Sequence, residues 1–330
     1  MKFISSIITA IVSGVAITLG GILFVNYIDS HFFTKVTSIK SEIVIENEED
    51  PTFISHLSRG VAYSAEDDVD AISGIFGNLP ASAIESQDNQ GSNVKNNTTK
   101  ISAKAYSVTD IDRDVVVFEH NAEQLLPIAS ITKLVTAVVA KKLLDPDHVI
   151  QIGRTSFATE GNSGKLRLDE TFKLKEILYP LLMVSSNDVA EAISASYGRK
   201  DFIKEMNTWV NSIGAYRTYF SDPSGLSANN KSTARDISII LKWIKIHEPD
   251  IFDITLTREK TIRTHTWVNP THFLSLASYE GGKNGYTTEA NRTTASLFSF
   301  GSPKRHYSVV LLGGNQRDSD VLAVINEAFK

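Results

Sequence analysis

The spacing of apolar and polar residues divides the chain into three parts, and the first is an uncharged run. No charged residue occurs from Phe3 to Ile28. As a helix rising about 1.5 Å per residue this run would measure about 39 Å, and a bilayer core needs only about 20 residues. A cleaved signal peptide would have a shorter apolar region and an Ala-x-Ala-like site, which we do not find before Asp29. We therefore expect residues 1–28 to form a transmembrane anchor.

The second part, residues 29–100, is acidic and has little apolar periodicity. It holds 12 acidic and 5 basic residues, a net charge of -7, whereas the whole chain carries -5. Its last stretch, from Ser86 to Lys100, consists almost entirely of Ser, Asn, Gln, Thr, Gly and charged residues. Such a stretch cannot bury enough apolar area to offset the entropy lost on ordering. We expect a spacer over residues 29–100, with residues 81–100 disordered.

The third part, residues 101–330, has the periodicities of a folded domain. Apolar residues at helix spacing predict helices over residues 131–143, 174–184, 189–197, 202–213, 233–247 and 321–329. Apolar runs between turn residues predict strands over residues 103–108, 115–118, 255–263, 276–283, 293–300 and 307–312. This order predicts an α+β fold. An antiparallel sheet would be built from both ends of the domain and flanked by helices, with the middle helices inserted as an all-helical lobe.

Composition and charge narrow the function classes. The chain is 42% apolar and 22% charged, with a pI of about 5.9, so no basic excess indicates a nucleic-acid partner. It contains no cysteine, which excludes disulfides, thiolate metal sites and thiol nucleophiles. Its histidines show no His-Glu-x-x-His or similar spacing. We therefore expect neither a metal nor a cofactor.

A candidate nucleophile and base occur together in the segment Ser130-Ile131-Thr132-Lys133, at the start of the first long helix. Residues at i and i+3 share a helix face, so the Ser130 hydroxyl and the Lys133 amine can meet. A serine needs an adjacent base, and a lysine becomes one only when burial or a nearby cation lowers its pKa. The alternative is a capping serine followed by a surface lysine, since Ser92 and Lys95 have the same spacing.

Two further segments carry polar groups that would complete such a site. Ser185-Ser186-Asn187 lies in the turn between two predicted helices, where a hydroxyl can relay a proton and an amide can hold a peptide carbonyl. A helix cap is the alternative there. The segment from Gly281 to Tyr286 ends a predicted strand, and its glycines allow close backbone approach. Its Lys283 would supply a positive charge or carry a proton, and an ordinary glycine turn is the alternative.

The order and setting of these segments resemble those of the penicillin-recognising serine enzymes. Over about residues 103–330 the flanking sequence is similar to the serine-type D-alanyl-D-alanine carboxypeptidases, the low-molecular-mass penicillin-binding proteins. The resemblance is carried by Ala129-Ser130-Ile131-Thr132-Lys133-Leu134, Ser185-Ser186-Asn187-Asp188-Val189-Ala190, Asp222-Pro223-Ser224-Gly225-Leu226, Ser232-Thr233-Ala234-Arg235-Asp236 and His265-Thr266-Trp267. It implies a β-lactamase/transpeptidase-like fold and a carboxypeptidase-like catalytic domain over residues 101–330.

By this resemblance, Ser130 is the nucleophile that becomes acylated and Lys133 is its base. Ser185 would pass a proton to the leaving D-alanine with help from Lys283, and Asn187 would hold the peptide bond of the substrate. The backbone N–H groups of Ser130 and Tyr286 would form the oxyanion hole. The substrate-binding residues implied are Asn284, Gly285, Tyr286 and Thr287.

The resemblance also implies partners and a location. The family attacks peptidoglycan stem peptides ending in D-Ala-D-Ala, and β-lactam antibiotics inhibit it. These peptides lie outside the cytoplasmic membrane. We therefore expect a single-pass protein of the bacterial cytoplasmic membrane, anchored by its N-terminal helix, with the catalytic domain extracytoplasmic.

One residue departs from the pattern of the family, and other functions stay open. Asn284 stands where the family usually has the threonine of Lys-Thr-Gly, whose hydroxyl helps to grip the substrate carboxylate. An amide can also donate, but with a different reach. A DD-endopeptidase of peptidoglycan cross-links would share the chemistry, and a catalytically weak wall-binding module is a further alternative. A class A β-lactamase is disfavoured, because the comparable stretch after Ser185, Asp222-Pro223-Ser224-Gly225-Leu226, has no Glu-x-x-x-Asn pattern.

Overall fold

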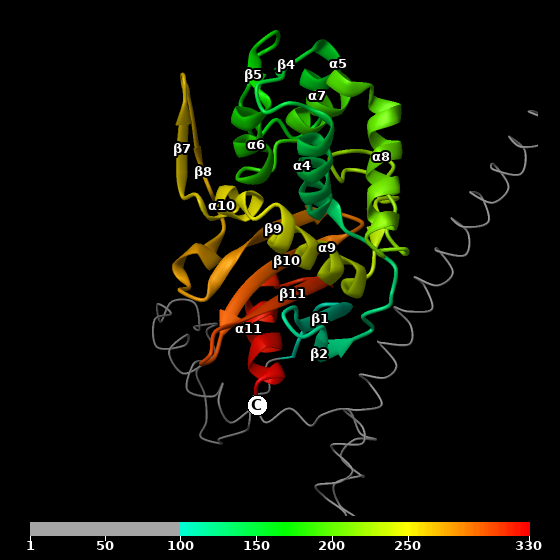
Figure 1. Ribbon diagram of the computed structural model, residues 1–330, viewed down its shortest axis with the longest axis vertical. Helices are drawn as coiled ribbons and strands as arrows, with labels where there is room; N and C mark the ends of the chain where they lie inside the picture. Colours follow the sequence, from blue (N-terminus) through cyan, green and yellow to red (C-terminus); the bar gives the residue numbers. More distant parts are fainter. Residues whose placement is uncertain (1–99) are drawn as a thin grey trace, which may run out of the picture. The chain divides into compact units, whose positions relative to one another are not determined.

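The computed structural model describes residues 100–330, which form a sheet and a helical lobe (Figure 1). The predicted anchor over residues 1–28, and the predicted spacer and linker up to residue 99, lie outside the described residues. Within residues 100–330, no helix combines the length and hydrophobicity needed to cross a bilayer. The prediction of an α+β fold with an antiparallel sheet is confirmed. The inserted lobe is mainly helical but not all-helical, because the short strands β4 (Val149–Gln151) and β5 (Thr171–Lys173) pair with each other and pack against its helices.

Five antiparallel strands form the sheet in the order β2-β1-β11-β10-β9. They are β1 (Ala105–Asp110), β2 (Val115–His120), β9 (Tyr279–Thr287), β10 (Asn291–Phe300) and β11 (Arg305–Gly314). β1 pairs with β11 in a register that sets Ala105 opposite Leu312, so strands from the two ends of the domain are neighbours. β9 pairs only with β10 in this sheet, which leaves one edge of β9 open toward the helical lobe.

Different helices cover the two faces of the sheet (Figure 1). Side chains alternate between the faces along a strand. On β11, Val310 and Leu312 belong to the core that includes residues of α9 (Ala234–His247). Tyr307 instead packs against Phe329, just after α11 (Arg317–Ala328), with 5.0 Å between the ring centroids. The sheet is therefore the middle of three layers.

The helical lobe is built around α4 (Thr132–Leu143), which follows the 3₁₀ turn η3 (Ala129–Ile131). Its periodicity predicted one apolar stripe, but every residue from Thr132 to Ala140 is buried, because other helices pack around it. A helix enclosed in this way carries even its polar side chains into the interior, and this places Lys133 away from water. The other helices of the lobe are α5 (Arg154–Phe157), α6 (Leu174–Leu182), α7 (Asn187–Tyr197), α8 (Arg199–Ser212) and α10 (Asp250–Leu256).

Two strand predictions are wrong in position where the lobe meets the sheet. The strand expected over residues 255–263 is instead the end of α10 followed by β7 (Glu259–Ile262), which pairs with β8 (His265–Val268). Short apolar runs fit a helix or a strand alike, and packing against α4, α6 and β9 stabilises the helix here. The strand expected over residues 276–283 runs from Tyr279 to Thr287. Lys283 therefore lies within the strand and not at its end.

The shortest elements were not predicted, because two to four residues are too few to show a period. They are the pair β3 (Leu126–Pro127) and β6 (Lys231–Ser232), the pair β4 (Val149–Gln151) and β5 (Thr171–Lys173), and the 3₁₀ turn η4 (His272–Ser275).

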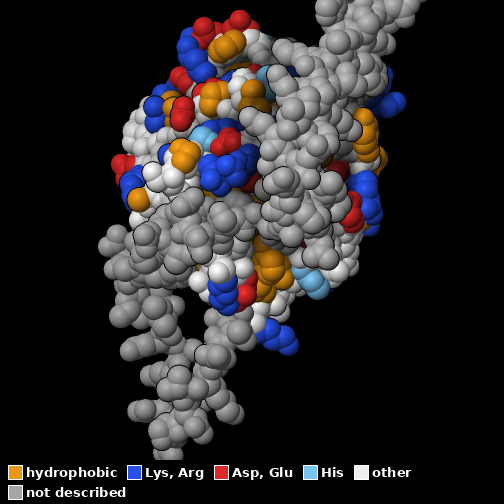
Figure 2. Space-filling view, turned by 60° about the horizontal axis from the view of Figure 1, so that its bottom comes forward, with side chains coloured by type: hydrophobic (Ala, Val, Ile, Leu, Met, Phe, Trp, Pro, Cys, Tyr) orange, Lys and Arg blue, Asp and Glu red, His pale blue; other side chains and the backbone are white. Residues whose placement is uncertain are grey.

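Charged side chains of both signs are interspersed with apolar ones on the face seen in Figure 2. Ion pairs join α9 to the β1–β2 hairpin: Arg235 lies 2.6 Å from Glu119, and Lys242 lies 2.5 Å from Asp114. Exposed pairs of this kind contribute little to stability individually. The buried core therefore holds the layers together.

Candidate active site

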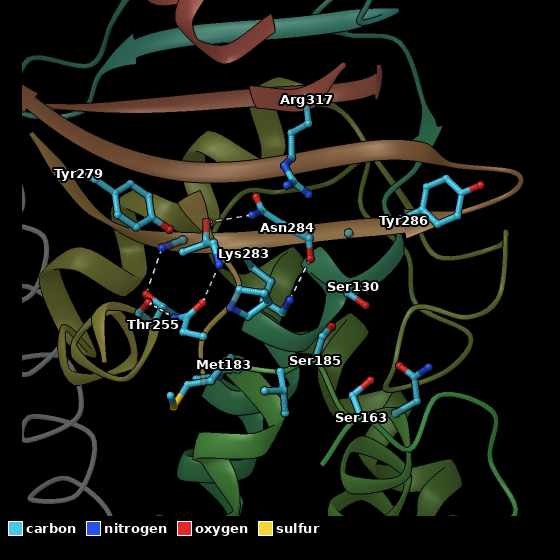
Figure 3. Close-up of a pocket in the computed structure, with 18 residues that line it drawn as sticks. Ser130, Ser163, Met183, Ser185, Thr255, Tyr279, Lys283, Asn284, Tyr286 and Arg317 are labelled. Carbon is cyan, nitrogen blue, oxygen red and sulfur yellow. Dashed lines mark hydrogen bonds between the residues drawn. The ribbon is translucent and has the colours of Figure 1, made fainter. Parts of the chain in front are cut away.

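A pocket of about 430 Å³ opens between β9 and the helical lobe (Figure 3). Its walls come from the 3₁₀ turn η3, the α6–α7 turn, the end of α10, the segment before η4, the strand β9 and the first residue of α11. The structure thus brings the three segments singled out in the sequence to one place. The lining residues among them are Ser130, Ser185, Asn187, Gly282, Lys283, Asn284, Gly285 and Tyr286.

The amine of Lys133 lies at the bottom of this site and has three hydrogen-bond partners. Its Nζ lies 3.0 Å from Ser130 Oγ, 2.6 Å from Asn187 Oδ1 and 2.6 Å from the carbonyl oxygen of Ser224. The residue is fully buried. Burial lowers the pKa of Lys133 well below its ordinary value, and the nearby Lys283 lowers it further, against the opposing charges of Asp222 and Asp188.

The three partners of the Lys133 amine are not equivalent. Asn187 Oδ1 and the Ser224 carbonyl oxygen can only accept hydrogen bonds, whereas a serine hydroxyl can also donate. A neutral amine has two N–H groups and one lone pair. With both N–H groups on the two acceptors, the lone pair faces Ser130 Oγ. The neutral amine is therefore oriented to take the Ser130 proton.

Strand β9 passes closely behind the nucleophile candidate. A Cβ on Gly285 would lie 2.8 Å from the backbone nitrogen of Ser130 and 3.0 Å from the Cβ of Ala129. Ala129 itself has a positive φ of 48°, which turns the chain sharply into η3. The approach needs glycine, and it brings the backbone of the following residue, Tyr286, beside Ser130.

The Ser185 hydroxyl is buried and available to a ligand, and its backbone conformation is unusual. Ser185 adopts a φ of 62°, in the left-handed region that residues other than glycine rarely occupy. Its Oγ is buried and has no hydrogen-bond partner among the residues that the structure describes. Within the same residues no hydrogen bond joins it to Lys283, whose Nζ donates to the Asn284 carbonyl at 2.8 Å.

Asn187 is held in place by a loop of the lobe. Its backbone N–H donates to the carbonyl of Gly161 at 3.1 Å, and its Nδ2 donates to the carbonyl of Glu160 at 2.9 Å. Its Oδ1 accepts from Lys133. An amide nitrogen has two N–H groups, so one of them is left for a ligand in the pocket.

Lys283 and Arg317 make the opposite wall of the pocket positive. Burial lowers the pKa of Lys283 to about 7, and the Arg317 guanidinium lowers it in the same direction. Figure 3 shows the Arg317 guanidinium directed toward Asn284. Two cationic side chains in one partly closed pocket suit an anionic group such as a carboxylate. No spacing in the sequence identified Arg317, which lies far from the three segments.

The two other predicted substrate-binding side chains differ in their setting. Asn284 lines the pocket and is fixed on both sides, because its Nδ2 donates to Thr271 Oγ1 at 3.1 Å and its Oδ1 accepts from Thr294 at 2.7 Å. Thr287 does not contribute to the pocket lining. Its hydroxyl accepts the N–H of Ala290 at 3.1 Å and so shapes the β9–β10 turn.

Comparison with solved structures defines the class of fold. The chain superposes on the D-alanyl-D-alanine carboxypeptidase of Mycobacterium tuberculosis with a TM-score of 0.63 at 22% identity, covering 74% of this chain and 95% of that one. It superposes on a penicillin-binding protein of Listeria monocytogenes in its ampicillin-bound form with a TM-score of 0.63 at 24% identity, covering 70% and 99%. The fold is that of the penicillin-binding proteins.

Sequence comparison then gives the family. The model of the peptidase family S11, described as D-alanyl-D-alanine carboxypeptidase, matches residues 91–311. The chain belongs to this family, as the resemblance in its motifs predicted.

Two curated relatives illustrate the range within the family. The D-alanyl-D-alanine endopeptidase of Escherichia coli is 34% identical over 180 residues, which are 53% of this chain and 56% of that protein. The D-alanyl-D-alanine carboxypeptidase DacF of Bacillus subtilis is 28% identical over 243 residues, 64% of this chain and 62% of that protein. The chain thus spans roughly half to two thirds of the length of these relatives.

Proposed function

We propose that the protein is a serine-type D-Ala-D-Ala carboxypeptidase that trims peptidoglycan stem peptides through an acyl-enzyme at Ser130. One observation carries this proposal. A fully buried lysine amine lies 3.0 Å from a serine hydroxyl that lines a pocket, and its other two hydrogen bonds go to acceptor oxygens. This is the arrangement that a serine nucleophile needs for its base.

In the acylation step, Ser130 Oγ attacks the carbonyl carbon of the penultimate D-alanine while Lys133 takes the hydroxyl proton. The charge that develops on the carbonyl oxygen is stabilised by the backbone N–H groups of Ser130 and Tyr286. Gly285 permits this pairing, because a side chain there would collide with the Ser130 nitrogen.

Release of the leaving D-alanine requires a proton on its nitrogen. The Ser185 hydroxyl, which has no hydrogen-bond partner within residues 100–330, lines the pocket and is placed to deliver it, and Lys283, with its pKa of about 7, lines the same pocket from β9. The C–N bond breaks, leaving an ester on Ser130. The proton that Lys133 took from Ser130 then replaces the one that Ser185 gave away, so that Lys133 is neutral again. Water then hydrolyses the ester, and Lys133 accepts the proton of that water and returns it to Ser130.

The substrate lies along the open edge of β9 in this proposal, as an added strand. The remaining N–H of Asn187 holds a carbonyl of the peptide. The terminal carboxylate binds between Asn284 and Arg317, which both line the pocket. Asn284 thereby takes the part that a threonine has in the usual motif.

A DD-endopeptidase of peptidoglycan cross-links is the second candidate. It is supported by the E. coli relative, which carries that name at 34% identity. The bond that is cleaved and the acyl-enzyme would be the same. Only the size of the leaving group differs.

We also propose that the protein is held at the bacterial cytoplasmic membrane, with residues 101–330 on the outer side. The uncharged run from Phe3 to Ile28 supports this location, and so does the peptidoglycan substrate, which lies outside that membrane.

Mass spectrometry of muropeptides incubated with the purified full chain tests the function. Loss of one alanine from monomeric pentapeptides is expected for the carboxypeptidase. Conversion of cross-linked dimers to monomers would establish the endopeptidase instead. Muropeptides that stay unchanged with the wild type, as with Ser130→Ala, would overturn both.

A further inference from the structure

The turn between α8 and α9 is shaped by a single buried carboxylate. Asp222 is 7% exposed. Its Oδ1 accepts the backbone N–H groups of Ser224 and Gly225 at 2.7 and 2.6 Å, and the Ser224 hydroxyl at 2.7 Å. Its Oδ2 accepts the N–H of Ser227 at 2.8 Å. A carboxylate that accepts several N–H groups at such distances fixes the turn in one conformation.

This turn touches both members of the serine–lysine pair. The Ser224 carbonyl oxygen accepts from Lys133 Nζ at 2.6 Å. Gly225 has a φ of 89°, and a Cβ there would lie 2.0 Å from the Ala129 carbonyl oxygen and 3.0 Å from the Ser130 nitrogen. The carboxylate of Asp222 thus acts indirectly, through Ser224 and Gly225, on Lys133 and on the backbone of Ser130.

We infer that Asp222 is a positioning residue for catalysis, because it holds the Ser224 carbonyl on the Lys133 amine and so keeps the amine lone pair directed at Ser130 Oγ. This inference rests on the proposed acyl-enzyme mechanism. Asp222 does not line the pocket, and within residues 100–330 it forms no ion pair with Lys133. Asp222 therefore acts on Lys133 in two ways: through the turn that it holds in place, and through the electrostatic effect of its charge.

Three charged groups act on Lys133: Lys283 on β9, Asp188 on α7, and Asp222 on the turn. The charge of Asp222 raises the pKa of Lys133. The Ser224 carbonyl also favours the protonated amine, which has one more N–H to donate. Removing Asp222 therefore lowers the pKa of Lys133. Because the neutral amine is the base, acylation would then persist to lower pH.

The test compares Asp222→Ala and Asp222→Asn in the full-length protein. The measured quantity is the second-order rate constant of Ser130 acylation by a fluorescent penicillin as a function of pH. Asp222→Ala is expected to lower the plateau of this constant at least about tenfold. Asp222→Asn should keep it within about threefold, because an amide oxygen can still accept from Ser224 and Gly225. In both variants the decline at acid pH is expected to begin at a lower pH.

Asp236→Asn is the matched control. Asp236 is 6% exposed and accepts the N–H of Arg217 at 2.7 Å and the Thr218 hydroxyl at 2.9 Å, but it is not among the charged groups that act on Lys133. This variant is expected to lose thermal stability without moving the acid limb of the profile. If Asp222→Ala does not fold, the inference is tested by the position of the acid limb in Asp222→Asn.

Two failures are distinguishable. If the penicillin labels the wild type but the acid limb of Asp222→Asn is not shifted, the inference alone is overturned, and Asp222 has a purely structural role. A wild type that the penicillin does not label would overturn the proposed function, and the inference with it.

Discussion

The backbone nitrogen of Ser130 lies so close to Gly285 that a Cβ on this glycine would be only 2.8 Å from it. The Thr293 hydroxyl, at 2.6 Å from the same Cβ position, closes the other side. The distance between β9 and η3 is therefore set by the absence of one methyl group. The proposed oxyanion hole depends on this distance.

We expect Gly285→Ala to lower acylation by a fluorescent penicillin at least about tenfold, because β9 must move away from η3 and take the Tyr286 N–H with it. Gly153→Ala is the control, because a Cβ at Gly153 meets no atom within 4 Å. Stopped-flow labelling measures both. Wild-type rates in Gly285→Ala would show that the Tyr286 N–H does not contribute.

Ser130→Ala is expected to abolish penicillin labelling, and Lys133→Ala to reduce it at least about a thousandfold, because nucleophile and base act as a unit. Ser92→Ala removes the other serine that stands three residues before a lysine and should be labelled like the wild type. Intact-mass spectrometry after incubation measures the adduct. An adduct that survives in Ser130→Ala would refute the assignment of the nucleophile.

Lys283→Met is expected to stabilise the fold while impairing acylation. Burial lowers the pKa of Lys283 from 10.5 to about 7, so between these values the unfolded chain binds more protons than the folded one. Stability therefore rises with pH across this interval, and the full penalty of the buried charge is present below about pH 7. Replacing the charge by an apolar side chain should raise the unfolding free energy at pH 6 by about 1–4 kcal/mol.

Thermal unfolding at pH 6 and pH 9 measures this difference, which should be smaller at pH 9. Lys141→Met is the contrast, because Lys141 is paired with Glu248 and Asp250 at 2.5 Å each and its loss should not stabilise the protein at either pH. Equal melting temperatures for Lys283→Met and the wild type at pH 6 would contradict the buried cation.

Arg317→Gln is expected to lower acylation by carboxylate-bearing penicillins about 10- to 100-fold, because it removes a charge-assisted partner of the carboxylate. A penicillin methyl ester, which lacks that charge, provides the control: wild type and variant should react with it at similar rates. An equal loss with acid and ester would mean that Arg317 acts only on the fold of the site.

Local spacing was sufficient to predict the Ser130–Lys133 contact, because one helical turn fixes both ends of it. It was also sufficient for the longer helices and for the strands β1, β2, β10 and β11, whereas the position of β9 was predicted wrongly. The contribution of Arg317 could not be predicted in this way. Its proximity to Lys283 depends on how α11 follows β11 across the sheet.

The same reason explains the errors in the predicted elements. The apolar run at the end of α10 is too short for its spacing to distinguish a helix from a strand. Its contacts with α4 and β9 determine that it is helical. The complete burial of α4 likewise depends on helices that surround it. The role of Asp222 becomes visible only once its hydrogen bonds to the following turn are known.

The pairing of β1 with β11 has a consequence for biosynthesis. Ala105 finds its partner only when Leu312 has been made, so a growing chain carries β1 with one neighbour until its last strand leaves the ribosome. Pairing between such distant residues is slow to form, and until it does β9 and β10 have no completed sheet to join. Reactivity toward penicillin should therefore be acquired in one late step, and pulse-labelled chains that stop before β11 should remain inert and sensitive to proteases.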